Sequence, residues 1–577
     1  MASTTAQIDD TIPIAGSQRT ITQFIKIDAS NIPFEPERWS VVIIGSSMIG
    51  MTLGALLGFH GVPSLSFDRH TSTAIHPRAA LFLLRSVEIF RQLGLDEHFR
   101  ENSAKNFDLD AGMLITDKLV GGKTIMALQE SDPEQVAKVS PVDRFWLTQN
   151  MFEPLIRDRA REFGATQKFQ HTVLNYEEVS DGVIVYVQDL ATGQIKKYHT
   201  QYLVATDGNR SATRAKEEIA WHGPGILGSA ISVNFHADLR PYLGVRAKHG
   251  VTYITNPKVD AGFRLESEGT RGFMIVTRAG ERTSFAPDSV SAADAKQFFR
   301  DASGITEDIE IQVDSINYWS VAGFSADKMA NPSNRILIAG DAAHVMPPTG
   351  GMGGNTGIQD AYNLAWKLAY VTQGKAGHDL LASYGAERIP VNKFYLDQAY
   401  SRFQKRVAHT KPDTPELPDV VCELGSLYKS GAIVRGPNDT TTAEQGYEDP
   451  FDPRVQAGSR LPHVRILDTR SPARKVSTLD LVKREFLLIA VDADSPWLKV
   501  AGSLPLALDT FIVNGNSLPF QDRENQVRKV MKLTEGAALL VRPDGVIAWR
   551  APVIETGHLK LLQTTLEEIL HKSMERR

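Results

Sequence analysis

Short apolar runs alternate with longer periodic segments along the chain, and this pattern predicts a mixed α/β protein. Residues 41–45 and 335–339 contain nearly continuous apolar runs, which are typical of strands buried on both faces of a parallel sheet. Each run leads into a Gly-rich stretch, and each stretch leads into a segment of small or apolar residues at helical spacing. The order strand, Gly-rich loop and helix therefore occurs twice.

The middle of the chain follows a different pattern. Apolar and polar residues alternate from about Trp221 to Tyr318, most clearly over residues 231–235, 251–255 and 272–276. A period of two residues predicts strands with two unlike faces, so we expect a mostly antiparallel sheet in this region. The sequence does not indicate which face of each strand points inward.

A further α/β unit is predicted near the C-terminus. Strand-like runs cover about 485–491, 510–513 and 537–541, and a tight turn at 543–545 leads into another strand. A helix over about 559–570 completes this unit.

The first Gly-rich stretch follows the pattern of a dinucleotide-binding βαβ unit. Its residues from Gly45 to Gly50 fit G-x-G-x-x-G, except that Ser47 stands at the middle glycine. Asp68 follows the second strand near the expected spacing of ~20 residues, where an acid can bind an adenosine ribose. The Ser47 Cβ takes some room from a diphosphate, but we expect its hydroxyl to donate to a phosphate oxygen.

The second Gly-rich stretch, from Gly340 to Asn355, combines an acid, two prolines and several glycines. Asp341 ends the preceding strand, where its carboxylate can accept hydrogen bonds from ribityl or ribose hydroxyls. Pro347 and Pro348 stiffen the loop, and the glycines let a flat ring approach the backbone. The next helix directs its N–H groups and positive end to the same point, which suits an anionic ligand.

The segment from Gly340 to Ala369 resembles the second flavin motif of the single-component flavoprotein aromatic hydroxylases, the family of phenol hydroxylase and para-hydroxybenzoate hydroxylase. Asp207-Gly208, followed by Ser211 and Arg214, is similar to that family's third motif, which is linked to flavin and nicotinamide binding. The resemblance implies a Rossmann-like FAD-binding domain, an inserted mostly antiparallel β-sheet substrate domain and a C-terminal thioredoxin-like α/β domain.

On this basis we divide the chain into five parts. They are an N-terminal extension over 1–38, a discontinuous FAD-binding domain over 39–220 and 331–408, a substrate-binding sheet domain over 221–330, a linker over 409–455 and the thioredoxin-like domain over 456–577. The last domain has no C-x-x-C motif, because the single cysteine, Cys422, lies outside it, so we expect no dithiol chemistry there.

The resemblance also assigns FAD contacts. Arg78 matches a family arginine that reaches the flavin, and Gln149 matches a glutamine that hydrogen-bonds the flavin chain. The expected cofactor-binding residues are Gly45, Ser46, Ser47, Met48, Ile49, Gly50, Asp68, Arg69, Arg78, Gln149, Asp207, Asp341, Pro348, Gly351, Met352, Gly353, Gly354 and Asn355. Phenol hydroxylase has an acid near the position of Ala80, and the alanine here disfavours a simple phenol as substrate.

The resemblance implies an enzyme that consumes NADPH or NADH, bound transiently, together with O2. In that family reduced FAD forms a C4a-hydroperoxide, which delivers oxygen to an electron-rich ring. We therefore expect hydroxylation of a phenolic or polycyclic aromatic substrate, in natural-product (polyketide-like) metabolism. Tyr253 and Arg264 are the candidate catalytic residues, and Asn234 and Phe263 are further candidates for the substrate pocket.

Other functions remain open on the sequence alone. Baeyer–Villiger oxygen insertion and epoxidation would use the same cofactor chemistry. Flavin halogenases share this FAD-binding layout, but their W-x-W-x-I-P string is absent from the sequence. A non-catalytic scaffold stabilised by FAD is a remote alternative, and the intact motifs at Asp207 and Gly350 argue against it.

Composition narrows the choice of partners. The formal net charge of −5 gives no electrostatic reason to expect a nucleic acid or an anionic membrane. No apolar run is long enough to span a bilayer, and residues 1–40 lack the apolar core of a signal peptide. One cysteine excludes an internal disulfide and a cysteine-based metal cluster. We expect a cytoplasmic protein without a bound metal, and the resemblance adds a homodimer.

Overall fold

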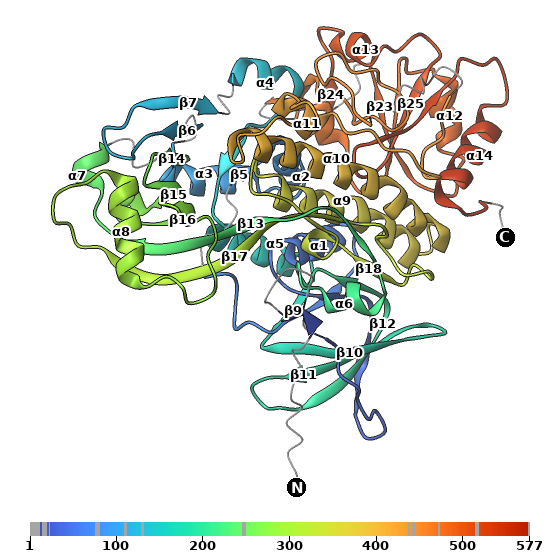
Figure 1. Ribbon diagram of the computed structural model, residues 1–577. Coiled ribbons are helices and arrows are strands. Elements are labelled where there is room, and N and C mark those ends of the chain that lie inside the picture. The colour runs from blue at the N-terminus through green and yellow to red at the C-terminus, as the bar shows by residue number, and fades with distance from the viewer. Residues whose placement is uncertain are drawn as a thin grey trace.

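The computed structural model describes residues 12–13, 20–21, 23–75, 81–108, 112–128, 132–244, 250–436, 439, 446–470, 474–513 and 519–574. These residues form two large sheets, a C-terminal α/β unit and a layer of long helices between them (Figure 1). The predicted mixed α/β class with a Rossmann-like domain is confirmed.

The first large sheet contains both apolar runs. Its order is β10-β11-β12-β3-β4-β9, and β18 pairs with the C-terminal part of β12. Strands β18, β12, β3, β4 and β9 are parallel, and the hairpin β10-β11 extends one edge. The bounds are β3 Phe34–Ile44, β4 Ser64–Asp68, β9 Thr166–Phe169, β10 His171–Val179, β11 Gly182–Asp189, β12 Ile195–Ala205 and β18 Ile336–Ile338.

Four helices build the core against this sheet. Helix α1 (Met48–Phe59) packs against both α5 (Gln149–Glu162) and α9 (Met352–Thr372), and α9 packs against α10 (Ala382–Arg406). Most residues of α1 are buried, because sheet and helices surround it. Shorter elements connect these pieces: β5 Leu81–Phe82, α2 Leu84–Gln92, α3 Asp96–Asn106, α4 Pro133–Val139, β8 Phe145–Trp146, α6 Ala212–Lys216 and α11 Asp419–Leu424.

The second large sheet contains the alternating strands. Its order is β19-β17-β13-β16-β15-β14-β6-β7, and every pair is antiparallel except β14 with β6. β6 and β7 come from a segment that precedes residue 221, so the sheet extends beyond the predicted range. The bounds are β6 Met113–Thr116, β7 Thr124–Leu128, β13 Trp221–His236, β14 Val251–Thr255, β15 Val259–Glu266, β16 Arg271–Ala279, β17 Gln312–Ala326 and β19 His344–Val345.

Helix α8 (Ala292–Ser303) packs on one face of this sheet, and the apolar side chains of that face form a separate hydrophobic core with it. Phe299 of α8 contacts Phe235 and Phe263, with ring centroids 4.8 and 5.5 Å apart. The prediction that Phe263 lines the substrate pocket is wrong, because its side chain lies in this core. Asn234 and Arg264 alternate with these residues along their strands and therefore lie on the opposite face.

The C-terminal unit has the strands and the closing helix that the sequence predicts. A four-stranded sheet of order β23-β22-β25-β26 has one parallel pair, β22 with β23, and a second sheet has the order β21-β20-β24. Strand bounds are β20 Arg465–Asp468, β21 Arg474–Ser477, β22 Phe486–Ala490, β23 Leu508–Ile512, β24 Phe520–Gln521, β25 Ala538–Val541 and β26 Ile547–Ala551. Helix bounds are α12 Pro496–Ala501, α13 Gln526–Val530 and α14 His558–Leu570.

Both faces of the four-stranded sheet are buried, and α9 covers part of one of them. Trp366 and Tyr370 of α9 pack edge to face on Phe486 of β22, each with ring centroids 5.8 Å apart. These aromatic residues share one apolar cluster with Leu562 and Leu566 of α14. The C-terminal unit is therefore packed directly on a helix of the FAD-binding part.

A buried ionic network crosses the same boundary. Glu387 of α10 accepts two hydrogen bonds from Arg542, at 2.5 and 2.9 Å, and pairs with Lys367 of α9 at 2.8 Å. Arg542 also pairs with Asp544 in the turn between β25 and β26. Burial opposes ionisation of Glu387, but the charges of Arg542 and Lys367 outweigh that effect and lower its pKa. The network joins α9, α10 and the C-terminal unit through charges that have no access to water.

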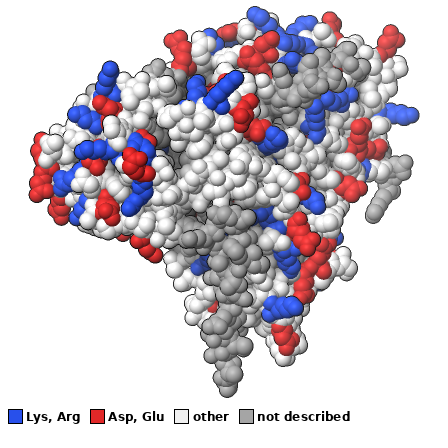
Figure 2. Space-filling model, viewed as in Figure 1, with Lys and Arg blue, Asp and Glu red and all other residues white. Residues whose placement is uncertain are grey.

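The outer surface is mixed in charge. Acidic and basic side chains are interspersed over the face shown in Figure 2. Among the described residues, no helix is both long and apolar enough to cross a membrane.

Replacing the arginine of this network is expected to destabilise the whole molecule. Arg542→Met leaves two buried carboxylates to share one remaining cation, so we expect the unfolding free energy in urea to fall by ~3–5 kcal/mol. Arg240→Met, in an exposed ion pair with Asp238, should cost less than ~1 kcal/mol. Equal effects of the two substitutions would contradict this interpretation.

Candidate active site

The parallel strands of the first sheet end at one edge, and both Gly-rich stretches begin there. Gly45 follows β3 with a φ of 99°, and a Cβ at this position would lie 2.6 Å from the carbonyl oxygen of Thr206. Only glycine fits this turn without strain, because the region of positive φ is unfavourable for other residues. Backbone hydrogen bonds Thr206 N to Ile44 O and Ala339 N to Ala205 O keep the strand ends together.

Asp68 lies at the end of β4 and binds the first turn. One carboxylate oxygen accepts from the backbone N–H of Ser46 at 2.7 Å, and the other accepts from that of His70 at 2.9 Å. The carboxylate is half-buried, whereas Arg69 is exposed. Asp68 thus stands beside the loop that would bind a diphosphate, where its remaining lone pairs can accept from ribose hydroxyls.

Ser47 precedes α1 at the N-cap position, but its side chain makes no capping hydrogen bond. The hydroxyl instead donates to Glu153 at 2.6 Å, and the amide of Gln149 donates to the Ser47 oxygen at 2.8 Å. The hydroxyl was expected to donate to a phosphate oxygen, but its O–H already donates to Glu153 in this structure. Sequence analysis did not single out Glu153, although its position four residues after Gln149 on α5 was a usable signal.

Asp207 has an unusual environment after β12. One carboxylate oxygen accepts from the backbone N–H and the hydroxyl of Thr213, at 3.2 and 3.1 Å. The other oxygen is buried and has no hydrogen-bond partner. Desolvation raises the pKa of Asp207 above its ordinary value, even though Ser211 and Thr213 stabilise the charged form. A ligand group that donates a hydrogen bond would satisfy this oxygen.

The second Gly-rich stretch forms a short turn, η3 (Gly340–Ala342), and then leads to α9. Asp341 and Pro348 are exposed, whereas Gly353 and Gly354 are half-buried in the first turn of α9. Gly351 caps this helix with a φ of 66°.

Asn355 lies one turn into α9. Its side-chain oxygen accepts from the backbone N–H of Leu83, and its amide donates to the carbonyl oxygens of Leu81 and Gly351. It was expected to bind the cofactor, and in the structure its side chain joins the segment around β5 to the start of α9. Arg78 lies outside the described residues, so no contact is assigned to it.

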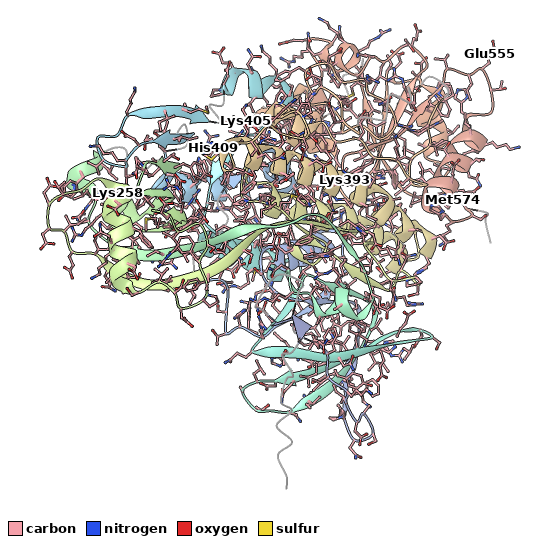
Figure 3. All side chains as sticks on the ribbon, viewed as in Figure 1. Lys258, Lys393, Lys405, His409, Glu555 and Met574 are labelled. Atoms are coloured by element: carbon pink, nitrogen blue, oxygen red, sulfur yellow. The ribbon has the colours of Figure 1, made fainter. Side chains whose placement is uncertain are left out.

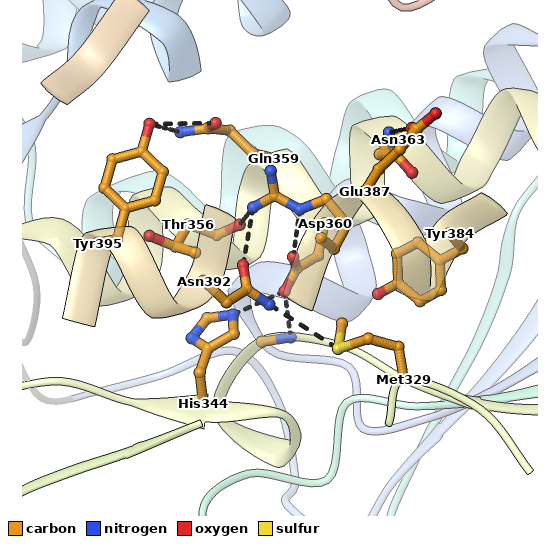
Figure 4. Close-up of polar contacts among 12 residues, drawn as sticks. Met329, His344, Thr356, Gln359, Asp360, Asn363, Tyr384, Glu387, Asn392 and Tyr395 are labelled. Atoms are coloured by element: carbon orange, nitrogen blue, oxygen red, sulfur yellow. Dashed lines mark hydrogen bonds and ion pairs between the residues drawn. The ribbon is translucent and has the colours of Figure 1, made fainter. Parts of the chain in front are cut away.

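A buried carboxylate on α9 holds the second stretch in place (Figure 4). Asp360 accepts from the backbone N–H of Gly340 at 3.1 Å, lies 2.7 Å from Nε2 of His344 and accepts from Nε of Arg388 at 2.7 Å. Burial opposes its ionisation, but the interactions with His344 and Arg388 outweigh that effect and lower its pKa. The network fixes the geometry of the loop that follows β18.

Tyr253 and Arg264 lie together on the face of the second sheet that α8 does not cover. Tyr253 is paired with Gly262 on β15, two residues from Arg264, and its ring lies over the open side of that glycine. The Arg264 guanidinium lies over the rings of Trp146 and Phe107, 4.6 and 5.4 Å from their centroids.

Arg264 is a buried cation that feels the charge of Glu266, although the ion pair of that carboxylate is with Arg271. Arg264 is 3% exposed, and one of its Nη atoms is buried without a hydrogen-bond partner. Among the described residues no carboxylate forms an ion pair with it. Burial lowers its pKa to about 10, which still leaves it charged at neutral pH. Desolvation raises the pKa of Tyr253, so this phenol stays protonated and can donate a hydrogen bond.

Leu81 connects this cluster to the loop at the start of α9. Leu81 and Tyr253 both pack against the cluster of Phe107, Met113 and Trp146, and Leu81 lies 3.5 Å from the position of a Cβ at Gly351. The same face of the sheet continues as a row of polar contacts, in which Asn234 donates to Ser315 at 2.8 Å and Trp319 donates to Ser232 at 3.0 Å. Hydrogen-bonding groups of the sheet therefore lie near the Gly-rich loop.

These features fit FAD. The unpartnered oxygen of Asp207, the uncapped first turn of α1 and the open Gly-rich start of α9 supply acceptors and N–H donors at one sheet edge. Asp68 and the loop from Gly45 to Gly50 would hold the adenosine and diphosphate. Gln149, Asp341 and the start of α9 would hold the ribityl chain and the ring.

Comparison with protein families matches residues 38–399 to the FAD binding domain and residues 454–573 to the aromatic-ring hydroxylase C-terminal domain. The chain is 37% identical to 4-methyl-5-nitrocatechol 5-monooxygenase of Burkholderia sp. over 89% of this chain and 94% of that protein. It is 31% identical to tetracenomycin B2 monooxygenase-dioxygenase of Streptomyces olivaceus, over 92% and 99%. A solved ternary complex of aklavinone-11 hydroxylase with FAD and aklavinone has a TM-score of 0.84 at 26% identity, over 92% and 99%.

Removing the charge of Asp360 is expected to lower both the stability of the protein and its affinity for FAD. Asp360→Asn leaves Arg388 without its carboxylate partner, so we expect the unfolding free energy to fall by ~3–5 kcal/mol. Titration with FAD should also show weaker binding, because the loop after β18 loses its anchor.

Asp397→Asn is the matched control on α10, since Asp397 pairs with Lys393 on the solvent side of that helix (Figure 3). It should change stability by less than ~0.5 kcal/mol. An Asp360→Asn protein as stable as this control would show that the buried network is dispensable.

Proposed function

The chain belongs to the family of FAD-dependent aromatic-ring hydroxylases, and on that premise we propose that Tyr253 and Arg264 bind and activate a phenolic ring. The family establishes an FAD-dependent monooxygenase that uses NAD(P)H and O2. The observation that carries the proposal is the buried, unpaired guanidinium of Arg264 close to the loop at Gly351. An anionic oxygen on the substrate would give this guanidinium a direct ion-pair partner.

The two side chains would act in different ways. Arg264 would stabilise the phenolate form of the substrate, because a cation in a site of low polarity interacts strongly with a nearby anion. Tyr253, held in its protonated form, would donate a hydrogen bond to the same oxygen. A phenolate ring is more electron-rich than the neutral phenol, which favours attack on an electrophilic oxygen. FAD supplies the oxygen transfer when it is bound, and the protein positions the ring and excludes water.

We place the natural substrate among polycyclic, polyketide-like phenols. Support comes from the similarity to tetracenomycin B2 monooxygenase-dioxygenase and to aklavinone-11 hydroxylase. The similarity to 4-methyl-5-nitrocatechol 5-monooxygenase supports a smaller ring as the competing substrate class. Both classes carry an ionisable phenol, so the proposed role of Arg264 is common to them. A homodimer and a cytoplasmic location are further proposals, the second supported by the use of a single cysteine.

The proposed substrate class is tested by NAD(P)H oxidation under air. The flavin-loaded protein should oxidise NADPH or NADH faster when a substrate binds, and product NMR should show a hydroxyl group on the ring. The panel should include anthraquinone-type phenols, naphthols and nitrocatechols. Stimulation by nitrocatechols alone would reject the polyketide-like class. Flavin binding without stimulation by any phenol would contradict a phenolic substrate.

The role of Arg264 predicts a shift in pH dependence. A neighbouring cation lowers the pKa of a bound phenol, so in the native enzyme kcat should rise with pH through a midpoint below the free phenol's pKa. Arg264→Met should lower kcat by ~10²-fold and move that midpoint upward. Arg264→Lys should restore part of both effects. A reduced kcat with an unchanged midpoint would assign Arg264 a structural role only.

A further inference from the structure

Glu153 accepts hydrogen bonds from three chain segments beside the proposed FAD site. Its carboxylate, 1% exposed, accepts from the Ser47 hydroxyl and from the Gln149 amide at 2.6 Å each, and its second oxygen accepts from the backbone N–H of Ala74 at 2.6 Å. These three partners belong to the first Gly-rich turn, the start of α5 and the loop after β4. All three segments border the place where a diphosphate would lie.

Ser47 has two possible hydrogen-bonding arrangements at the N-terminus of α1. A serine at the N-cap commonly accepts from the backbone N–H groups of the first helical turn. In this structure it does not, because its side chain is turned toward Glu153 and Gln149. The N–H groups of the first turn of α1 are therefore left for another acceptor, and a diphosphate is suited to take them.

We propose that Glu153 is a positioning residue for FAD, which holds the Ser47 hydroxyl away from the N-terminus of α1. The family pattern has glycine at this position, which has no side chain that could cap the helix. The serine hydroxyl competes for the N–H groups that would bind the diphosphate, and Glu153 removes this competition by accepting a hydrogen bond from the hydroxyl. Glu153 thereby lets this chain use serine where the pattern has glycine. This inference rests on the FAD site described above.

The first test is the dissociation constant of FAD in Glu153→Gln. The amide is close in shape to the carboxylate, but its NH2 group opposes one of the donors that now converge on Glu153, so Ser47 becomes free to cap α1. We expect FAD binding to weaken about tenfold, as for the loss or gain of one capping hydrogen bond. Glu162→Gln is the matched control, because Glu162 lies on the same helix with its side chain 61% exposed.

The second test separates positioning from general destabilisation. In a Ser47→Gly background there is no hydroxyl to hold back, so Glu153→Gln should weaken FAD binding by no more than about threefold. The melting temperature of each apoprotein should be measured in parallel, because a merely structural Glu153 would lower it equally in both backgrounds.

Four results are possible. Coupling between positions 47 and 153 in FAD affinity, with apoprotein melting little changed, supports it. Equal losses in the serine and glycine backgrounds, or a Glu153→Gln protein that binds FAD like the native chain, would overturn it. Failure of the native protein itself to bind FAD would instead reject the cofactor assignment on which the proposed function depends.

Discussion

Two buried carboxylates, Asp360 and Glu387, each need a cationic partner, and the arrangement of the molecule depends on this constraint. Neither side chain has access to water, so each must be matched by a cation and by hydrogen-bond donors. Asp360 finds them in His344, Arg388 and the N–H of Gly340. The cationic partners of Glu387 are Lys367 on α9 and Arg542 in the C-terminal unit. The helix pair α9–α10 can therefore adopt its position only when the cofactor loop and the C-terminal unit are both in place.

This coupling gives the C-terminal unit a physical role without redox chemistry. Its sheet covers Trp366 and Tyr370, and its turn at Arg542 supplies the counter-charge inside the helix pair. The N-terminus of α9, beside which the flavin would lie, is at the other end of the same helix. The C-terminal unit can in this way hold α9 in position through packing and charge alone.

The two halves of the active site use polar groups differently. On the cofactor side the donors belong mainly to the backbone and the carboxylates are tied to neighbouring loops, so the site is ordered by local hydrogen bonds. On the proposed substrate side the buried guanidinium of Arg264 lies among aromatic rings. A buried charge without a direct ion-pair partner is costly in the absence of a ligand, and a bound phenolate would relieve that cost.

Local sequence determined much of this structure. The apolar runs, the glycines of the tight turns and the spacing of Asp68 follow from steric and hydrogen-bonding rules that act over a few residues, and the structure has the corresponding strands, turns and helices. The resemblance of the segment from Gly340 to Ala369 was enough to identify the family.

Only the tertiary structure decided which face of the substrate sheet points inward. Alternation defines two faces but not their surroundings, so Phe263 and Arg264 were equivalent candidates until α8 was seen to cover one face. The hydrogen-bond partners of Ser47, Asp360 and Glu387 could not be predicted from the local sequence either. A buried polar group bonds to side chains that the fold brings near it, and these come from distant parts of the chain. Those partners lie up to 155 residues away in the chain, as Arg542 does from Glu387.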